Sequence, residues 1–131
     1  MLGATQEQWL ENALTQSTAR WNIIAQTTLM GQAERGAADE RMVHTDGWDG
    51  YPAAREKLLR FIAQHKIRNP VVIGGDVHFA MAGDLRVDFD NEHSPVIASE
   101  FVATSISSYG PGRARTEALL GKNPHVKFAN G

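Results

Sequence analysis

A short Asp/His motif is the part of this sequence best suited to chemistry. Asp76 and His78 lie two residues apart in the segment 74–78 (Gly-Gly-Asp-Val-His), directly after the apolar run at 71–73. In an open α/β sheet, ligands collect beyond the carboxyl ends of the strands, where these two side chains would lie. Carboxylate oxygen and imidazole nitrogen suit iron, manganese, zinc or a mixed pair of metals. The motif predicts a metal site at Asp76 and His78, although so short a pattern also occurs in ordinary turns.

The composition excludes several classes of function. The chain has 13 basic and 15 acidic residues and a net charge of −2. Since no basic cluster is interleaved with aromatic residues, nucleic acid is not expected as a specific partner. No apolar stretch approaches the roughly 20 residues of a transmembrane helix, and no secretory signal is recognisable. Because there is no cysteine, any metal must be held by His and carboxylates.

The pattern of apolar residues and turns predicts an α/β chain of about one domain, without internal repeats. The expected elements are a helix ending near residue 16, a strand at 21–26, a loop at 27–51, a helix at 52–66, a strand at 71–73, strands at 84–87 and 95–102, and a closing helix at 113–120. Residues 5–8 (Thr-Gln-Glu-Gln) have the form of a capping box. Strand, helix and strand in this order predict a crossover with parallel strands at 21–26 and 71–73.

The long loop at 27–51 holds a second group of candidate residues, because a loop of this length in a compact domain is often functional. Its segment 46–51 (Asp-Gly-Trp-Asp-Gly-Tyr) has two interpretations. Either Asp49 caps the next helix while Trp48 and Tyr51 pin the loop to the core, or the segment contacts metal or substrate. His44 in the same loop is either a solvated side chain or a group that assists the metal or a proton transfer.

The remaining polar candidates carry weaker predictions. Glu100 lies on an expected strand, followed by a hydroxyl-rich turn. Ser105 in that turn lacks the Gly-x-Ser-x-Gly elbow of a serine hydrolase, so no nucleophile is expected there. His65 near a helix end is interpreted as structural and His93 as part of a polar hairpin tip, while the role of His125 stays open. No phosphate-binding glycine motif supports a nucleotide cofactor.

Six segments, in order and over nearly the whole chain, resemble the carboxyl-terminal half of the alkaline phosphatase D family. These PhoD-like metallophosphatases belong to the calcineurin-like metallophosphoesterases. The segments are 2–10, 19–26, 46–55, 75–78, 100–108 and 123–128. The resemblance implies a two-sheet sandwich flanked by helices and the hydrolysis of small phosphate mono- or diesters at a multinuclear site with iron and calcium. It implies that Asp76 and His78 each supply a ligand to one of two metals, and that the parent protein is secreted, periplasmic or at the cell surface.

The resemblance also has a departure. The family's earlier Asp- and Asn-bearing ligand segments have no counterpart here, so residues 1–131 are expected to be a C-terminal fragment of the phosphatase domain, inactive by itself. The segments 21–26 and 71–73 are apolar without alternation, which is typical of strands that are covered on both faces. An isolated chain is therefore expected to expose an apolar sheet face. The alternative is a non-catalytic, truncated domain with weak or no metal binding. The sequence leaves the oligomeric state open.

Overall fold

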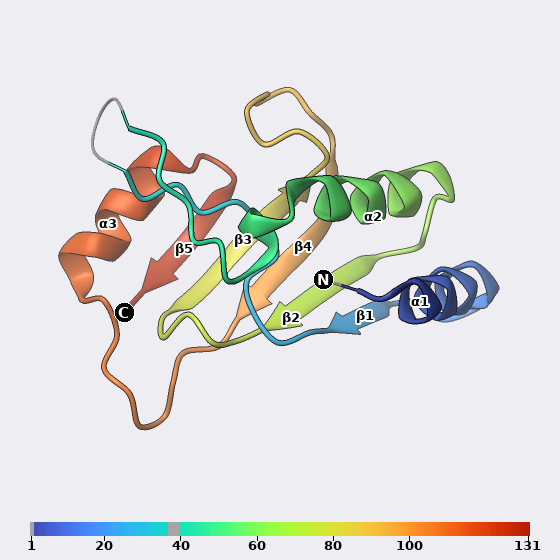
Figure 1. The fold of residues 1–131 in the computed structure, drawn as a ribbon, viewed down its shortest axis with the longest axis horizontal. Helices are drawn as coiled ribbons and strands as arrows, with labels where there is room; N and C mark the ends of the chain where they lie inside the picture. Colours follow the sequence, from blue (N-terminus) through green and yellow to red (C-terminus); the bar gives the residue numbers. More distant parts are fainter. Residues whose placement is uncertain (1, 37–39) are drawn as a thin grey trace.

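The computed structural model describes residues 2–36 and 40–131. In this part of the chain, three α-helices, a 3-10 helix and five strands are formed (Figure 1). In chain order they are α1 (Ala4–Gln16), β1 (Asn22–Ala25), η1 (Trp48–Gly50), α2 (Pro52–Gln64), β2 (Pro70–Gly74), β3 (Ala80–Arg86), β4 (Val96–Val102), α3 (Arg113–Lys122) and β5 (Val126–Asn130). No helix in the two described ranges is long and apolar enough to cross a membrane.

The five strands form one mixed sheet in the order β1-β2-β4-β3-β5. β1, β2 and β4 are parallel, whereas β3 runs antiparallel to both β4 and β5. The expected parallel pairing across the first crossover is therefore confirmed, as is the α/β class. The described residues supply a single sheet, so the second sheet of the implied sandwich is not formed by them.

Three local predictions differ from the structure. Gly3, with an extended backbone, is the N-cap of α1, and the N–H of Glu7 donates to its carbonyl, so Thr5 is already helical and the capping box does not form. β3 begins at Ala80 because pairing with β4 and β5 extends it through small residues of low strand propensity. The sequence interpretation missed β5, which forms by pairing with β3 at the end of the chain.

The helices and the long loop cover one face of the sheet (Figure 1). Under α2, the side chains of Leu58, Leu59 and Ile62 pack in one core cluster with those of Val72 and Leu85. A second cluster lies beside α3, where Leu119 joins Met81, Val102 and Val126. The two clusters include Ile24 of β1, Val72 of β2 and Val102 of β4, so they pack against the three parallel strands.

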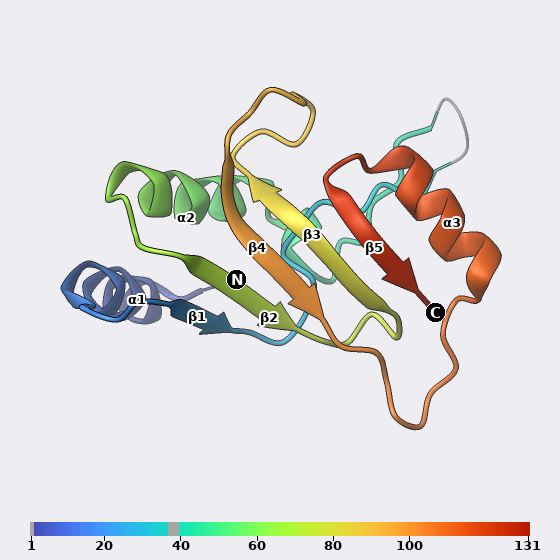
Figure 2. The same cartoon turned by 180° about the vertical axis from the view of Figure 1, so that it is seen from behind.

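The other face of the sheet is open. No helix crosses β2, β3 and β4 when the sheet is seen from behind (Figure 2). The exposed fractions of its apolar side chains are 64% for Ile23, 42% for Ile73, 51% for Phe101 and 52% for Phe128. Ile23, Ile73 and Phe101 alternate with more buried residues along their strands. The expected apolar face is therefore present, and nothing in the described residues covers it.

Candidate metal-binding site

Three parallel strands end at the same edge of the sheet, which is the predicted place for the site. The pairs Ala25–Ile73 and Ile73–Phe101 bring the ends of β1, β2 and β4 level. The segments that follow these strands are 26–36, 75–79 and 103–112. Asp76 and His78 lie in the second of them, so the structure places them where the sequence predicted.

Asp76 and His78 have an unusual local geometry. Both side chains are exposed, and their backbones have φ angles of +70° and +62°. The N–H of Val77 donates to the carbonyl of Gly75 over 2.9 Å, which closes a three-residue turn centred on Asp76. Positive φ is uncommon for residues other than glycine and is costly unless the surroundings fix it, and such residues cluster at functional sites.

The two side chains are also without partners. In residues 2–36 and 40–131, neither Asp76 nor His78 makes a side-chain hydrogen bond or an ion pair. Their oxygen and nitrogen atoms are thus available to a metal ion. However, the described part of the chain brings together no group of three or more His, Asp or Glu side chains that could hold one. This chain contributes two candidate ligands rather than a complete site.

A neighbouring loop fixes the position of the turn. A Cβ atom at Gly74 would lie 2.2 Å from the carbonyl oxygen of Thr28, so only glycine lets the two backbones approach this closely. Thr28 is itself held by Gln26, whose side-chain oxygen accepts its N–H over 3.1 Å and whose amide donates to its carbonyl. The same oxygen accepts the indole N–H of Trp48 over 3.1 Å. The prediction that Trp48 pins the loop to the core is confirmed.

Glu100 is a fully buried carboxyl group beneath this loop. It accepts the N–H of Met30 over 2.6 Å and that of Gly31 over 2.8 Å. Burial raises the pKa of Glu100 to about 7, although the two amides and the Arg55 guanidinium favour its charged form. It lies on β4 between Ala98 and Val102, which also face the core. Because every second residue of a strand faces the same side, this spacing could have indicated its buried position.

Asp49 and Arg55 form a buried ion pair that holds the same loop. Asp49 also accepts the N–H of Ala33 over 2.9 Å, while Arg55 donates to the carbonyl of Met30 over 3.2 Å. Asp49 therefore does not cap α2, whose N-cap is Tyr51 without a side-chain bond. A carboxylate satisfied in this way is not free for a metal.

The other candidates of the long loop lie at the surface. Tyr51 is half exposed, so the prediction that it pins the loop to the core is wrong. Asp46 is exposed. His44 is exposed too, but it lines a small void together with Val77, the residue between the two candidate ligands.

The C-terminal segment completes the support of the loop. The Asn123 side chain accepts the N–H of Glu34 over 2.9 Å and donates to its carbonyl over 3.0 Å. The buried His125 ring lies 2.8 Å from the carbonyl of Gln32, and burial lowers its pKa. The open question about His125 thus has a structural answer. The contacts between Asn123 and Glu34 were missed because the two residues are 89 positions apart in sequence.

The hydroxyl-rich turn after β4 shows no arrangement for nucleophilic catalysis. The hydroxyl of Ser105 donates to the carbonyl of Ser108, and within the described residues it makes no hydrogen bond to a histidine. His93 is exposed in the connection between β3 and β4, as expected for a hairpin tip.

Comparisons with known proteins agree with the fold and with the family resemblance. The family model described as PhoD-like phosphatase matches residues 1–131. Alkaline phosphatase D of Bacillus subtilis (strain 168) is 44% identical over 133 residues, which cover 99% of this chain and 23% of that protein. A solved structure described as "Structure of PhoD" matches with a TM-score of 0.90 and 45% identity, over 98% of this chain and 25% of that one. The chain thus spans about a quarter of the length of these relatives, and it belongs to the PhoD-like phosphatase family.

Proposed function

We propose that this chain forms part of the active site of a metal-dependent phosphoric ester hydrolase, of the alkaline phosphatase or phosphodiesterase type. The observation that carries the proposal is the turn at 75–79. It presents Asp76 and His78 at positive φ, without side-chain partners among residues 2–36 and 40–131, at the carboxyl edge of three parallel strands. That the chain is 44% identical to an alkaline phosphatase supports the same reaction class.

The residues present fit a metal centre of the kind that the family resemblance implies. The Asp76 carboxylate suits iron or calcium, and the His78 imidazole suits iron, so each side chain would supply one ligand. Bound metals would activate water and neutralise charge on the phosphoryl oxygens of a small ester substrate. The contribution of this chain is to hold the two ligands in place. The buried contacts of Gln26, Glu100 and Asp49 fix the loop against which their turn is packed.

Two ligands do not make a complete site, because catalytic metals usually have about three protein ligands each. We therefore propose that the other ligands come from residues beyond these 131, since the chain spans only about a quarter of the length of its relatives. The open apolar face of the sheet supports this proposal, since such a face is normally covered. The 131 residues alone are expected to show no ester hydrolysis above background.

A chimera tests the proposal directly. This chain would replace the matching stretch of B. subtilis alkaline phosphatase D, and hydrolysis of nitrophenyl esters and metal content would be measured on the chimera and on the 131 residues alone. We expect turnover and bound metal only in the chimera. A folded chimera without metal or activity would favour the non-catalytic alternative. Metal-dependent turnover by the 131 residues alone, abolished by His78→Ala, would refute the need for further ligands.

The open sheet face gives a second test of the same proposal. Exposed Ile23, Phe101 and Phe128 should drive edge-to-edge or face-to-face association of the isolated chain. We expect oligomers by light scattering and binding of a dye that reports exposed apolar surface. A monomer with one cooperative melt and no dye binding would show that these residues close their own core.

A further inference from the structure

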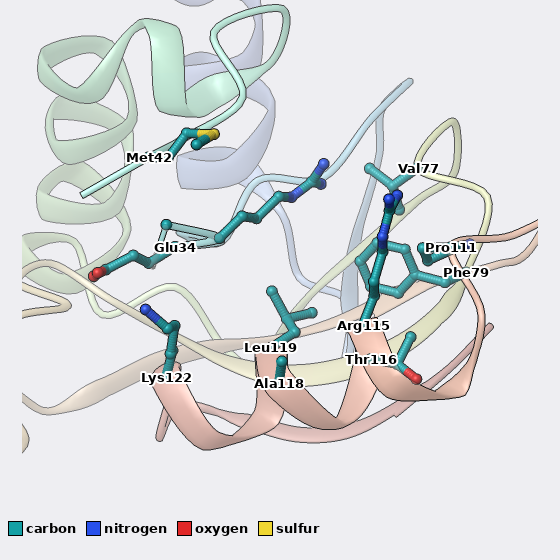
Figure 3. Close-up of a pocket in the computed structure, with 12 residues that line it drawn as sticks. Glu34, Met42, Val77, Phe79, Pro111, Arg115, Thr116, Ala118, Leu119 and Lys122 are labelled. Atoms are coloured by element: carbon teal, nitrogen blue, oxygen red, sulfur yellow. The ribbon is translucent and has the colours of Figure 1, made fainter. Parts of the chain in front are cut away.

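A pocket of about 380 Å³ opens beside the candidate ligands, between α3, the segment 77–79 and the loop around residues 34–36 (Figure 3). Its volume lies within the range of roughly 300–1,000 Å³ that is usual for small-molecule sites. The side chains that argue for a ligand are Glu34, Val77, Phe79, Arg115, Leu119 and Lys122.

The pocket adjoins the candidate metal site through Val77. This residue lies between Asp76 and His78, and its side chain lines the pocket. Figure 3 shows the Arg115 side chain extending from α3 toward Val77, with Phe79 beside it. Glu34 and Lys122 lie at the opposite end. A molecule bound here would have one end at the turn of the candidate ligands.

The chemistry of the lining favours an anion with an apolar body. Phe79 and Leu119 are buried and form an apolar wall, extended by Val77. Arg35, Arg115 and Lys122 bring three positive charges, against one negative charge from Glu34. Within the described ranges none of these three cations forms an ion pair. Arginine in particular binds phosphate oxygens through paired N–H donors.

We propose that this pocket binds the organic group of an anionic phosphate ester, and that it selects esters whose organic group is aromatic or branched and apolar. The phosphate lies at the Val77 end, where Arg115 binds one of its oxygens, and the organic group lies along Phe79 and Leu119. That the ligand is a phosphate ester rests on the proposed function. That the pocket binds an anion with an apolar group rests only on the residues that line it.

A binding experiment tests the pocket without any turnover. 1-Naphthylphosphonate and methylphosphonate would be titrated against the chimera described above and against the 131-residue chain. We expect the naphthyl compound to bind at least about tenfold more tightly, since even one methylene group in a hydrophobic pocket changes discrimination by roughly 10- to 200-fold. Arg115→Gln and Ala118→Trp, both at exposed positions of α3, should each weaken its binding by about tenfold.

Arg113→Gln is the matched control, because Arg113 is an exposed arginine of the same helix that pairs with Glu117 and does not line the pocket. It should leave naphthylphosphonate binding unchanged. Equal affinity for the two phosphonates, or equal effects of the three variants, would overturn the proposal.

Kinetics on the chimera separate this inference from the proposed function. Ala118→Trp should raise KM for 1-naphthyl phosphate by about tenfold and that for glycerol phosphate by much less. If the chimera hydrolyses both esters and the variant affects them equally, the pocket inference fails while the proposed function stands. If the chimera hydrolyses neither but Arg115 and Ala118 still govern phosphonate binding, the proposed function fails and the pocket remains.

Discussion

Two segments that follow neighbouring parallel strands use their polar residues in opposite ways. After β1, the backbone of residues 28–34 is bonded by buried side chains from distant parts of the chain. After β2, the segment 75–79 exposes Asp76 and His78 at positive φ, and neither has a side-chain partner in the described part of the chain. Charged residues at one edge of a sheet therefore divide into those that hold the backbone and those that are left available for chemistry.

The first segment also explains how the second keeps its shape. A loop with buried backbone needs partners for its N–H and C=O groups, and Gln26, Asp49 and Glu100 supply them. The loop then presses Thr28 against Gly74, directly before the exposed turn. Support of this kind, in which neighbouring contacts hold the backbone of candidate ligands in place, is what a preorganised metal site requires.

The largest expected effect comes from the exposed segment. In the chimera, Asp76→Ala and His78→Ala should each lower ester hydrolysis by several orders of magnitude, because loss of a ligand removes charge that stabilises the transition state. Thermal melts should change little, since neither side chain has a partner in the described residues. His93→Ala, at the exposed hairpin tip, is the control. Reduced stability with normal activity per folded molecule would reverse the assignment of the two segments.

The next effect tests the buried segment. Asp49→Asn removes the partner of the buried Arg55 guanidinium and should lower the free energy of unfolding by roughly 3 kcal/mol. Urea unfolding of the chimera would measure it. Asp46→Asn, an exposed carboxyl in the same loop, should change stability by less than about 0.5 kcal/mol. Equal effects of the two substitutions would show that the ion pair does not hold the loop.

The raised pKa of Glu100 makes the stability of the buried segment depend on pH. Its pKa is raised from 4.5 to about 7 in the folded chain, so the folded state binds more protons than the unfolded state between these values. Its contribution to stability is therefore present below pH 4.5 and lost as the pH rises to about 7, by at most about 3 kcal/mol.

Unfolding free energies of the parent and of Glu100→Gln, measured from pH 4.5 to 8, should differ by an amount that depends on pH over this window. His125 acts in the opposite direction, because its lowered pKa removes stability as the pH falls below 6.5. This contribution is shared by both proteins and cancels in the difference. A difference that stays constant with pH would mean that Glu100 is charged throughout.

The smallest effect concerns strain in the turn. Asp76→Gly should be more stable than Asp76→Ala by about 1 kcal/mol, because glycine adopts a φ of +70° without steric cost. Both variants should be equally inactive, because both lack the carboxylate. Only their stability should differ, because it depends on the backbone conformation at this position. Equal melting temperatures would show that the turn relaxes to negative φ in solution.

The sequence predicted much of the frame and the place of the two candidate ligands in the fold. The alternation from strand to helix to strand gave the parallel pair β1 and β2, and the glycines after an apolar run placed Asp76 and His78 at the end of a strand. The same reasoning misplaced the cap of α1 and missed β5, because both depend on small differences in local preference that pairing or backbone geometry overrides.

Local patterns of residues determined the class of fold and the position of the two candidate ligands, because hydrophobic period, glycines and turns act over a few positions of the chain. Only the tertiary structure decided which polar residues hold the loop. Glu100 bonds residues 69 and 70 positions away, and His125 reaches Gln32 across 93 positions. Such contacts follow from the strand order β1-β2-β4-β3-β5, which brings these side chains under the loop and also leaves the other face of the sheet uncovered.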